Sequence, residues 1–345
     1  MDKDIKVIDL FCGIGGLTYG LKKAGLNVIL GIDIDNSCKY IYETNNNAPF
    51  MCKDIKTLDP NTLKSYFSKN DIKILVGCAP CQPFSSQTFK YNASKLHKDR
   101  DLLDYFLKII KKIEPDIVSM ENVPAITKQD VFYNFISYLK KKHYGVSYSF
   151  ILAQNYGVPQ NRRRLVLLAS KYGTINILPE THNKSNYVKV KDIIKTLPPI
   201  KAGETYYIDP MHKAKNLEDI NIKRIKQSKP KGSWKDWDES LLPNCYKKPS
   251  GSSYTSVYGR MSFDDISPTI TTQFYNYGSG RFGHPEQDRA ISLREGALLQ
   301  TFPIEYDFGN DINFTKTGRH IGNAVPPKLA EIIGKSILEH IRKYV

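Results

Sequence analysis

The stretch that decides the fold is Ile5-Lys6-Val7-Ile8-Asp9-Leu10, which runs directly into Phe11-Cys12-Gly13-Ile14-Gly15-Gly16-Leu17. The first six residues are mostly apolar, as expected of a buried strand. A glycine-rich turn between a strand and a helix lets a ligand approach the backbone near the helix N-terminus. The turn lacks the third glycine of the dinucleotide-binding fingerprint, so it predicts a ligand site without identifying the ligand.

The following residues, up to about residue 175, alternate apolar runs with helical periodicity, which is typical of a parallel sheet with crossover helices. Six apolar runs predict strands at residues 5–10, 28–32, 72–76, 117–120, 146–152 and 165–169. Apolar residues at helical spacing predict helices over 102–113 and 131–139, and Pro326-Pro327 opens a third amphipathic helix. The chain is therefore expected to have an α/β fold.

Asp33 ends the second predicted strand, 20 residues after Gly13. A carboxylate at this place can accept hydrogen bonds from both hydroxyls of a ribose. The glycine turn and Asp33 together predict a cofactor that carries a nucleoside. They do not distinguish a nicotinamide cofactor from S-adenosylmethionine.

Reactive side chains follow two further predicted strands. Residues 72–76 lead into Gly77-Cys78-Ala79-Pro80-Cys81, and Met120-Glu121-Asn122 places a carboxylate at the end of the next strand. Because ligands of open α/β sheets bind at the carboxyl ends of the strands, Cys81 on its tight turn is a candidate nucleophile. A lone C-x-x-C can also be a redox or zinc motif, but zinc would need a second such pair, and the sequence has none.

Two arginines are candidates for the same edge of the sheet. Gln160-Asn161-Arg162-Arg163-Arg164 leads into the last predicted strand. Alternate residues of a strand point the same way, which puts Arg162 and Arg164 on one side.

The composition favours a partner that carries negative charge. The chain has 345 residues, with 50 Lys and Arg against 35 Asp and Glu, a formal net charge of +15. An excess of this size, spread over the predicted folded segments, indicates a polyanion such as nucleic acid, although AT-rich coding DNA also enriches lysine. No apolar run approaches the about 18 residues of a membrane span, and the N-terminus resembles no secretory signal. The six cysteines are therefore expected to be reduced.

Residues 173–318 lack the strand–helix alternation and are punctuated by Pro, Gly, Ser and Tyr. Irregular, loop-rich segments commonly carry recognition on a small scaffold. Within this region, residues 269–282 combine hydroxyl, amide, aromatic and arginine side chains, a composition suited to base edges and phosphates. A tyrosine-rich surface hairpin would have the same composition.

These motifs resemble those of the cytosine-C5 DNA methyltransferases, and they occur in that family's order. The resemblance rests on six blocks: Asp9–Gly16, Pro80-Cys81-Gln82, Glu121-Asn122-Val123, Gln160-x-Arg162-x-Arg164, Arg294-Glu295-x-x-x-Leu299-Gln300-x-Phe302-Pro303 and Gly322-Asn323-Ala324-Val325-Pro326. It implies the S-adenosylmethionine-dependent methyltransferase fold, a Rossmann-like mixed sheet with helices on both faces. The catalytic and cofactor-binding domain would comprise residues 1–178 and 319–345. A smaller, loop-rich target-recognition domain would comprise residues 179–318.

The resemblance also implies a mechanism. The Cys81 thiolate would add to C6 of a flipped-out cytosine, which makes C5 nucleophilic enough to take the methyl group of S-adenosylmethionine. Glu121 would bind N3 and the exocyclic amine, Arg164 would bind the O2 side of the base, and Arg162 would support them. The expected product is S-adenosylhomocysteine, and no metal is implied.

The family's cofactor contacts carry over to nine positions of this sequence: Phe11, Gly13, Ile14, Gly16, Asp33, Ile34, Asp54, Pro80 and Asn323. Asp33 would bind the ribose, Ile34 would touch the adenine ring and Asp54 would bind the adenine amine. Many relatives have a larger, often aromatic, residue in place of Ile34, so adenine stacking would be weaker here. Asp54 could instead cap a helix.

DNA contacts are expected from two segments. Residues 85–100, with four basic side chains, resemble the mobile loop that closes over DNA in this family. The candidate DNA-binding residues are Ser85, Gln87, Thr271, Gln273 and Arg281. Arg281 is the candidate base reader because arginine binds guanine O6 and N7 in a bidentate way. Its alternatives are a phosphate contact or a structural ion pair.

The expected partner is double-stranded DNA. A cognate restriction endonuclease would be a partner in function and not necessarily in a complex, and the protein would be a cytoplasmic, nucleoid-associated monomer of bacterial or phage origin. Three other functions compete with this interpretation. Residues 254–259 faintly resemble the branch that methylates tRNA, but that branch's Cys-Phe-Thr hallmark is absent. A non-catalytic DNA-binding homologue would not need Cys81, Glu121 and Arg164, and a nicotinamide oxidoreductase does not fit the glycine pattern or the Pro-Cys turn.

Overall fold

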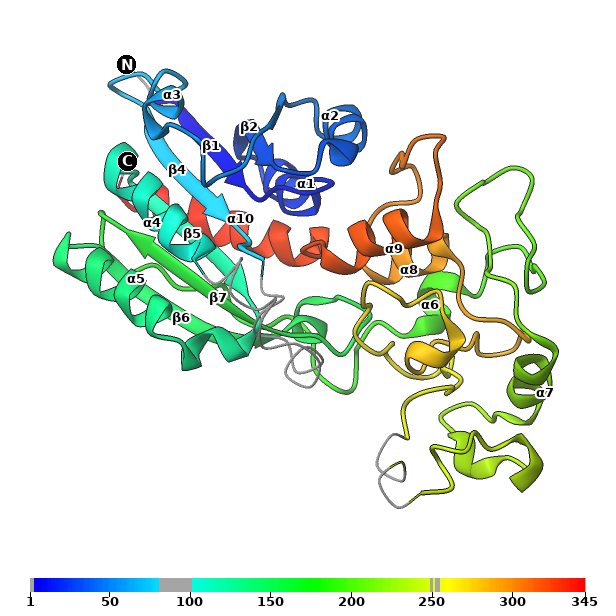
Figure 1. Cartoon of the computed structure of the whole chain (residues 1–345). Helices are drawn as coiled ribbons and strands as arrows, with labels where there is room; N and C mark the ends of the chain where they lie inside the picture. Colours follow the sequence, from blue (N-terminus) through cyan, green and yellow to red (C-terminus); the bar gives the residue numbers. More distant parts are fainter. Residues whose placement is uncertain (1–2, 81–100, 249–250, 252–254, 345) are drawn as a thin grey trace. The chain divides into compact units, whose positions relative to one another are not determined.

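The structure is a computed structural model that describes residues 3–80, 101–248, 251 and 255–344 (Figure 1). The chain folds into two compact units. Unit 1 comprises Met1–Tyr156, Arg163–Thr181 and Val325–Val345, and unit 2 comprises Gly157–Arg162 and His182–Ala324. This division differs from the predicted domain bounds at residues 157–162 and 319–324, which group with unit 2, and at residues 179–181, which group with unit 1.

Unit 1 is built on a seven-stranded mixed sheet in the order β3-β2-β1-β4-β5-β7-β6. The strands are β1 (Ile5–Leu10), β2 (Asn27–Asp33), β3 (Phe50–Cys52), β4 (Ile72–Gly77), β5 (Ile117–Asn122), β6 (Gly145–Leu152) and β7 (Arg163–Ser170). Strands β1 to β5 pair in parallel, whereas β7 is antiparallel to both β5 and β6. The mixed sheet is thus confirmed. The purely parallel pattern is wrong for β7, which runs opposite to the other six strands, because the link from β6 to β7 is too short for a crossover helix.

All six predicted strands are present, with bounds that agree to within two residues. The strand that the sequence did not predict is β3, which pairs with β2 from Gly31↔Phe50 to Asp33↔Cys52. Its three residues are too few to show a period, so only the pairing reveals it.

Helices cover both faces of the sheet. Those of unit 1 are α1 (Gly16–Lys23), α2 (Lys39–Asn46), α3 (Pro60–Lys64), α4 (Leu102–Ile113), α5 (Asp130–Lys141) and α10 (Pro327–Ile341). Ile8 of β1 belongs to the same core cluster as Phe106 of α4, whereas the next residue, Asp9, bonds to Thr18 of α1. Because successive side chains of a strand point to opposite faces, α4 and α1 lie on opposite sides of the sheet.

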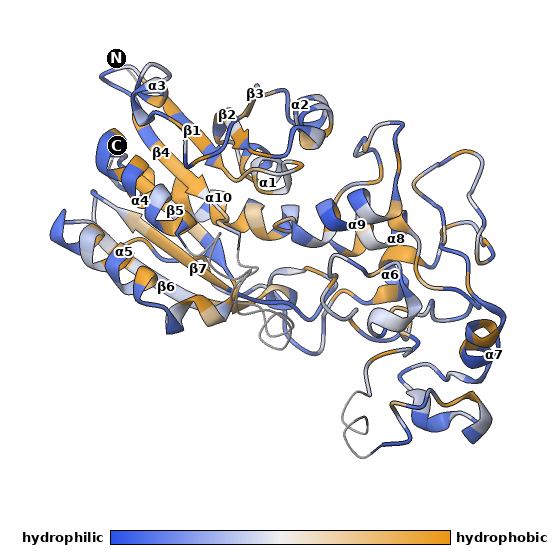
Figure 2. Cartoon of the chain, in the orientation of Figure 1, coloured by the Kyte–Doolittle hydropathy of each residue, from blue (hydrophilic) through white to orange (hydrophobic). Residues whose placement is uncertain are grey.

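The C-terminal helix completes this layer against α1. A Cβ at Gly20 of α1 would lie 2.2 Å from the carbonyl oxygen of Pro327 at the start of α10, so the two backbones meet at a glycine. In Figure 2 the sheet strands are mostly coloured hydrophobic, in keeping with their burial between the two helical layers. None of the helices among the described residues is long and apolar enough to cross a membrane.

Unit 2 consists of short helices and irregular segments. Its α-helices are α6 (Val190–Ile194), α7 (Asp219–Gln227), α8 (Leu293–Leu299) and α9 (Phe314–Asn323). In the described part of unit 2, β-pairing is limited to isolated bridges such as Arg260↔Gly283. One of its cores is a cluster around Trp234, Trp237 and Tyr277. The loop-rich character predicted for this region is therefore present, and aromatic side chains pack where regular strands would otherwise do so.

Candidate active site

The glycine turn after β1 has the open backbone that a ligand needs. Gly13 has a φ of 52° and Gly15 a φ of 88°, in the left-handed region that favours glycine. Around Gly13, a Cβ would meet no described atom within 4 Å, so the space beside its backbone is open. The turn therefore leaves room for another molecule at the start of α1.

Asp33, at the end of β2, ties this turn to the next strand. Its Oδ2 accepts a hydrogen bond of 2.8 Å from the backbone N–H of Gly13, and its Oδ1 accepts one of 2.9 Å from that of Asp35. A carboxylate offers about four acceptor positions, which is more than these two bonds use. Asp33, which is predicted to bind the ribose, therefore also shapes the glycine turn. The sequence did not indicate this structural role.

A hollow of about 220 Å³ lies beside Asp33 at the carboxyl ends of β1 and β2. Five of the nine predicted cofactor residues line it: Phe11, Asp33, Ile34, Asp54 and Pro80. Ile34 is 66% exposed, and Asp54 accepts a 2.9 Å bond from the backbone N–H of Lys56, so it also stabilises its own turn. The hollow is smaller than the about 300–1,000 Å³ of a typical ligand pocket, which fits the nucleoside part of a cofactor.

The other four predicted cofactor residues lie elsewhere. Gly13 contacts Asp33 through its N–H, while Ile14 and Gly16 are buried in the turn and at the first position of α1. Asn323 is the exposed last residue of α9 and belongs to unit 2.

Glu121, the last residue but one of β5, is the centre of a polar cluster at the same edge of the sheet. Its carboxylate is buried, with 3% of the side chain exposed, and Oε1 forms an ion pair of 3.1 Å with Nε of Arg164 on the antiparallel neighbour β7. The Cys78 thiol, directly after β4, donates a hydrogen bond of 2.8 Å to Oε2. The structure thus brings together Glu121 and Arg164, as predicted, and adds Cys78, which the sequence reasoning did not assign to the site.

Asn122 is a second residue of this edge whose role the sequence reasoning missed. Its side-chain amide donates a hydrogen bond of 3.1 Å to the carbonyl oxygen of Ala79, and its Oδ1 accepts one of 2.8 Å from the N–H of Val123. Asn122 therefore fixes the backbone that leads into Cys81. Its place inside the Glu121-Asn122-Val123 block was the available signal.

Arg162 has different surroundings from Arg164. Strand β7 begins at Arg163, so the alternation argument does not extend to Arg162. Arg162 is buried in unit 2, and its guanidinium donates hydrogen bonds of 3.4 Å and 3.2 Å to the carbonyl oxygens of Ile270 and Ala324. These bonds join three separate segments of unit 2.

Three predicted site residues, Cys81, Ser85 and Gln87, lie outside the described residues. The remaining candidate DNA contacts belong to unit 2. Gln273 is exposed and Thr271 half-buried, in a segment anchored by the buried Phe274. The Arg281 guanidinium donates to the carbonyl oxygens of Gly232 and Thr255, which hold the side chain in place.

The Arg294-Glu295 block of the sequence holds unit 2 together. Glu295, fully buried in α8, forms two bonds of 2.7 Å to the guanidinium of the equally buried Arg289. Arg294 pairs with Asp209 at 2.6 Å, and Gln300 donates to the carbonyl oxygen of Ala324 at 2.7 Å. These polar residues are therefore occupied in internal bonds.

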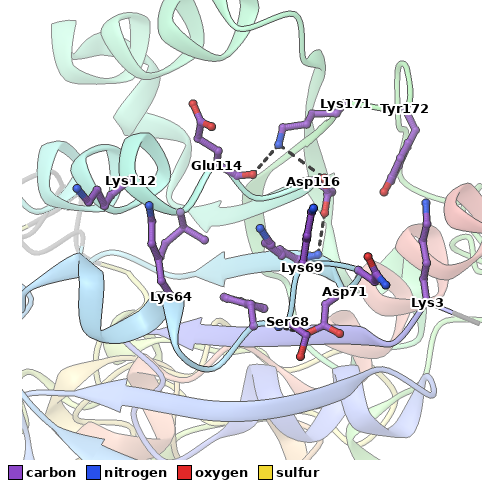
Figure 3. Close-up of a pocket in the computed structure, with 14 residues that line it drawn as sticks. Lys3, Lys64, Ser68, Lys69, Asp71, Lys112, Glu114, Asp116, Lys171 and Tyr172 are labelled. Carbon is purple, nitrogen blue, oxygen red and sulfur yellow. Dashed lines mark hydrogen bonds and ion pairs between the residues drawn. The ribbon is translucent and has the colours of Figure 1, made fainter.

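A second hollow, of about 640 Å³, lies at the opposite edge of the sheet, at the amino ends of β4 and β5 (Figure 3). Six lysines line it, and its three acidic residues all have basic partners: Asp71 pairs with Lys6, Glu114 with Lys142 and Asp116 with Lys171. None of the predicted site residues lines this hollow.

Comparisons with known proteins identify the family of the chain. The family model of the C-5 cytosine-specific DNA methylases matches residues 5–339. The chain is 52% identical over 336 residues to the type II methylase M.HgiDII of Herpetosiphon aurantiacus, covering 96% of this chain and 94% of that protein. It is 29% identical over 350 residues to the type II methyltransferase M.Sau96I of Staphylococcus aureus, covering 99% and 78%.

Among solved structures, a candidate DNA modification methyltransferase encoded within an E. coli prophage has the same fold. The TM-score is 0.74 at 21% identity, and the match covers 98% of this chain and 100% of that one. Together with the match of the family model over nearly the whole length, these findings show that the chain belongs to the C-5 cytosine-specific DNA methylase family.

Proposed function

We propose that this protein methylates C5 of a specific cytosine in duplex DNA through a covalent adduct of Cys81 with C6, using S-adenosylmethionine. The modified DNA would be the protected DNA of a type II restriction-modification system. The observation that carries the proposal is the cluster at the carboxyl edge of unit 1, where Arg164 and Cys78 hold Glu121 beside the segment that leads into Cys81.

The reaction assigned to these residues proceeds through a covalent intermediate, which divides it into an addition and an elimination. The Cys81 thiolate adds to C6 of the cytosine, and the electron pair of the C5–C6 double bond becomes available at C5. Transfer of the methyl group to C5 would leave S-adenosylhomocysteine. C5 then gives its proton to solvent, the electron pair re-forms the C5–C6 double bond, and the C6–S bond breaks to release the Cys81 thiolate. Glu121 binds N3 and the exocyclic amine of the base, and Arg164, paired with Glu121, binds the O2 side.

The cofactor proposal rests on the hollow beside Asp33. S-adenosylmethionine would supply a methyl group on a positively charged sulfur. Asp33 would accept hydrogen bonds from the ribose hydroxyls, Phe11 and Ile34 would contact the adenine, and Asp54 its amine. The open space beside the left-handed Gly13 fits a ligand that passes close to the backbone. Pro80, which also lines the hollow, completes the proposed set together with Ile14, Gly16 and Asn323.

Unit 2 is proposed to recognise the DNA target. Gln273 is exposed on a segment anchored by Phe274, so its amide can reach a base edge. Arg281 has five N–H donors, of which two bond to backbone carbonyls, so others remain for a base or a phosphate. Thr271 of unit 2, together with Ser85 and Gln87, completes the proposed DNA contacts.

A pair of variants separates the catalytic role from the cofactor role. Cys81→Ser should abolish methyl transfer to plasmid DNA and retain S-adenosylmethionine binding, because a hydroxyl is far less ionised than a thiol. Asp33→Ala should weaken cofactor binding by about 1–3 kcal/mol, measured by calorimetry, because ribose hydroxyls lose their acceptor. Bisulfite sequencing of the plasmid would identify the methylated cytosine.

Duplexes that contain 5-fluorocytosine test the adduct directly, since the fluorine cannot leave as the proton does. Covalent trapping should depend on Cys81. Trapping at Cys78 or Cys12, or methyl incorporation into tRNA in place of DNA, would contradict the proposal.

A further inference from the structure

We propose that Cys78 is a positioning residue that orients the Glu121 carboxylate toward the target base through its thiol hydrogen bond. This inference rests on the proposed function, because it concerns how Glu121 meets the cytosine. Cys78 is a different residue from the nucleophile and would form no bond to the base.

The sheet register places Cys78 opposite Glu121. Strands β4 and β5 are parallel and pair Gly77 with Met120. The next residue on each strand is Cys78 and Glu121, so continuing the register brings these two side chains together at the edge where the strands end. The observed distance from Sγ to Oε2 is 2.8 Å. Any residue at position 78 would therefore face the catalytic carboxylate.

The two oxygens of Glu121 have different partners. Oε1 lies 3.1 Å from Nε of Arg164 in an ion pair but accepts no hydrogen bond from the described residues, whereas Oε2 accepts one from the thiol of Cys78. An ion pair alone does not fix the plane of a carboxylate, whereas the directional thiol hydrogen bond at Oε2 restricts rotation about its last bond. Each oxygen retains a further lone pair, so the fixed carboxylate can still accept from the amine of a flipped-out cytosine.

The burial of Glu121 increases the contribution of the hydrogen bond from the Cys78 thiol. The Glu121 side chain is 3% exposed, so water has little access to replace a lost donor. A hydrogen bond to a charged group contributes about ten- to a hundredfold to the equilibrium that depends on it. The thiol acts as a donor only while it carries its proton, since a thiolate would repel the carboxylate.

The test compares Cys78→Ala, which removes the donor, with Cys78→Ser, which retains one. Cys78→Ala should lower kcat about tenfold or more with the KM for DNA and the affinity for the cofactor nearly unchanged. Cys78→Ser should retain activity to within a few-fold. Cys245→Ala, at an exposed cysteine of unit 2, is the matched control and should behave like the wild type.

A double-mutant cycle with Glu121→Gln shows whether Cys78 acts through Glu121. In the Glu121→Gln background, Cys78→Ala should have no further effect on the residual kcat. Equal losses in the Ala and Ser variants, or a Cys78→Ala effect that is undiminished by Glu121→Gln, would overturn the positioning role.

The contact itself can be measured without turnover. The four proteins of the cycle are the wild type, Cys78→Ala, Glu121→Gln and the double variant. Unfolded by urea, they should show a coupling between positions 78 and 121 in their unfolding midpoints. Absence of coupling would overturn the inference whatever the activity. An inactive wild-type protein that still shows the coupling would contradict the proposed function and leave the Cys78–Glu121 contact established.

Discussion

Units 1 and 2 each contain a fully buried carboxyl group, and the two groups have opposite properties. Asp9 of β1 is bonded to Thr18 of α1, and burial raises its pKa to about 7, with the nearby Asp33 charge adding to the shift. Glu295 of α8 is just as buried, yet the Arg289 guanidinium brings its pKa down to about 2 against the same effect of burial. Desolvation disfavours the charged form at both sites, so the hydrogen-bond and charge partners decide whether the pKa rises or falls.

The partners explain the difference in detail. Asp9 accepts a hydrogen bond of 2.7 Å from the hydroxyl of Thr18, a neutral donor that does not compensate a charge. Glu295 receives both of its 2.7 Å bonds from the Arg289 guanidinium, and the N–H of Ser292 adds a third. Unit 1 therefore holds a carboxyl that can gain a proton near neutrality, whereas unit 2 holds a permanent ion pair in its core.

The largest effect is expected from breaking the ion pair of unit 2. Arg289→Met should lower the free energy of unfolding by about 3–5 kcal/mol, because it leaves Glu295 buried and charged without its partner. Denaturant unfolding followed by circular dichroism would measure it. The double variant Arg289→Met with Glu295→Leu should recover much of the loss, since it removes both charges.

Lys191→Ala is the control for that experiment. It breaks an exposed ion pair of unit 2, between Lys191 and Asp264 at 2.8 Å, and should change the stability by less than about 1 kcal/mol. A similar loss from both single variants would contradict the comparison.

The next effect, in unit 1, depends on pH. The folded pKa of Asp9, about 7, lies above its ordinary value of 3.8, so the folded state binds the extra proton and its stability falls as pH rises through this range. Asp9→Asn stays neutral, so its unfolding free energy relative to the wild type should rise by about 2–3 kcal/mol from pH 5 to pH 8. Thermal unfolding at several pH values would measure it, with the exposed Asp104→Asn as control.

Unit 2 should respond to pH with the opposite sign. Burial lowers the pKa of His284 to about 4, and its Nδ1 accepts from the N–H groups of Glu286 and Gln287, so the ring is neutral at pH 7. Its contribution to stability is lost as pH falls from about 6.5 toward 4, and that of Glu295 as pH falls from 4.5 toward 2. If the unfolding free energy of Asp9→Asn relative to the wild type rose as the pH was lowered, the raised pKa of Asp9 in unit 1 would be contradicted.

The smallest effect concerns Arg281, a half-buried cation that bonds to neutral carbonyls where Arg289 bonds to a carboxylate. Arg281→Ala should relax the preference at one base pair of the target by about 1–3 kcal/mol, measured by competition between cognate and substituted duplexes. A uniform loss for all sequences, with a salt slope lower by about one, would instead indicate a phosphate contact. Unchanged DNA binding with a lower unfolding midpoint would assign Arg281 to the structure of unit 2.

Several elements could be predicted from the sequence because their signals are local. Ile5 to Leu10 form a short, mostly apolar run, and Leu102 to Ile113 have apolar residues at helical spacing. The strand and the helix are both present with those bounds. Five of the nine cofactor candidates line one hollow. Four of them follow predicted strands, whereas Asp54 follows β3, which the sequence did not predict. The six sequence blocks of the family could also be recognised because each is a local pattern of a few residues.

Contacts between residues that are distant in the chain could not be predicted from the sequence. The Arg294-Glu295 block was recognisable as a motif, but its bonds to Asp209 and Arg289 show only in the folded unit 2. Arg162 and Arg164, two residues apart in the sequence, bond to different segments because the strand begins between them. Spacing alone cannot specify such partners.

The sequence by itself determined where strands, turns and reactive side chains occur, because hydrophobic period and turn chemistry act over a few residues. Only the tertiary structure decided that Cys78 meets Glu121, that Asn122 holds Ala79, and that the pKa values of Asp9 and Glu295 move in opposite directions. Those outcomes depend on strand order, register and the packing of groups far apart in the chain. A carboxyl group's burial and its partner are properties of that packing, so the same type of group has a pKa near 7 in one unit and near 2 in the other.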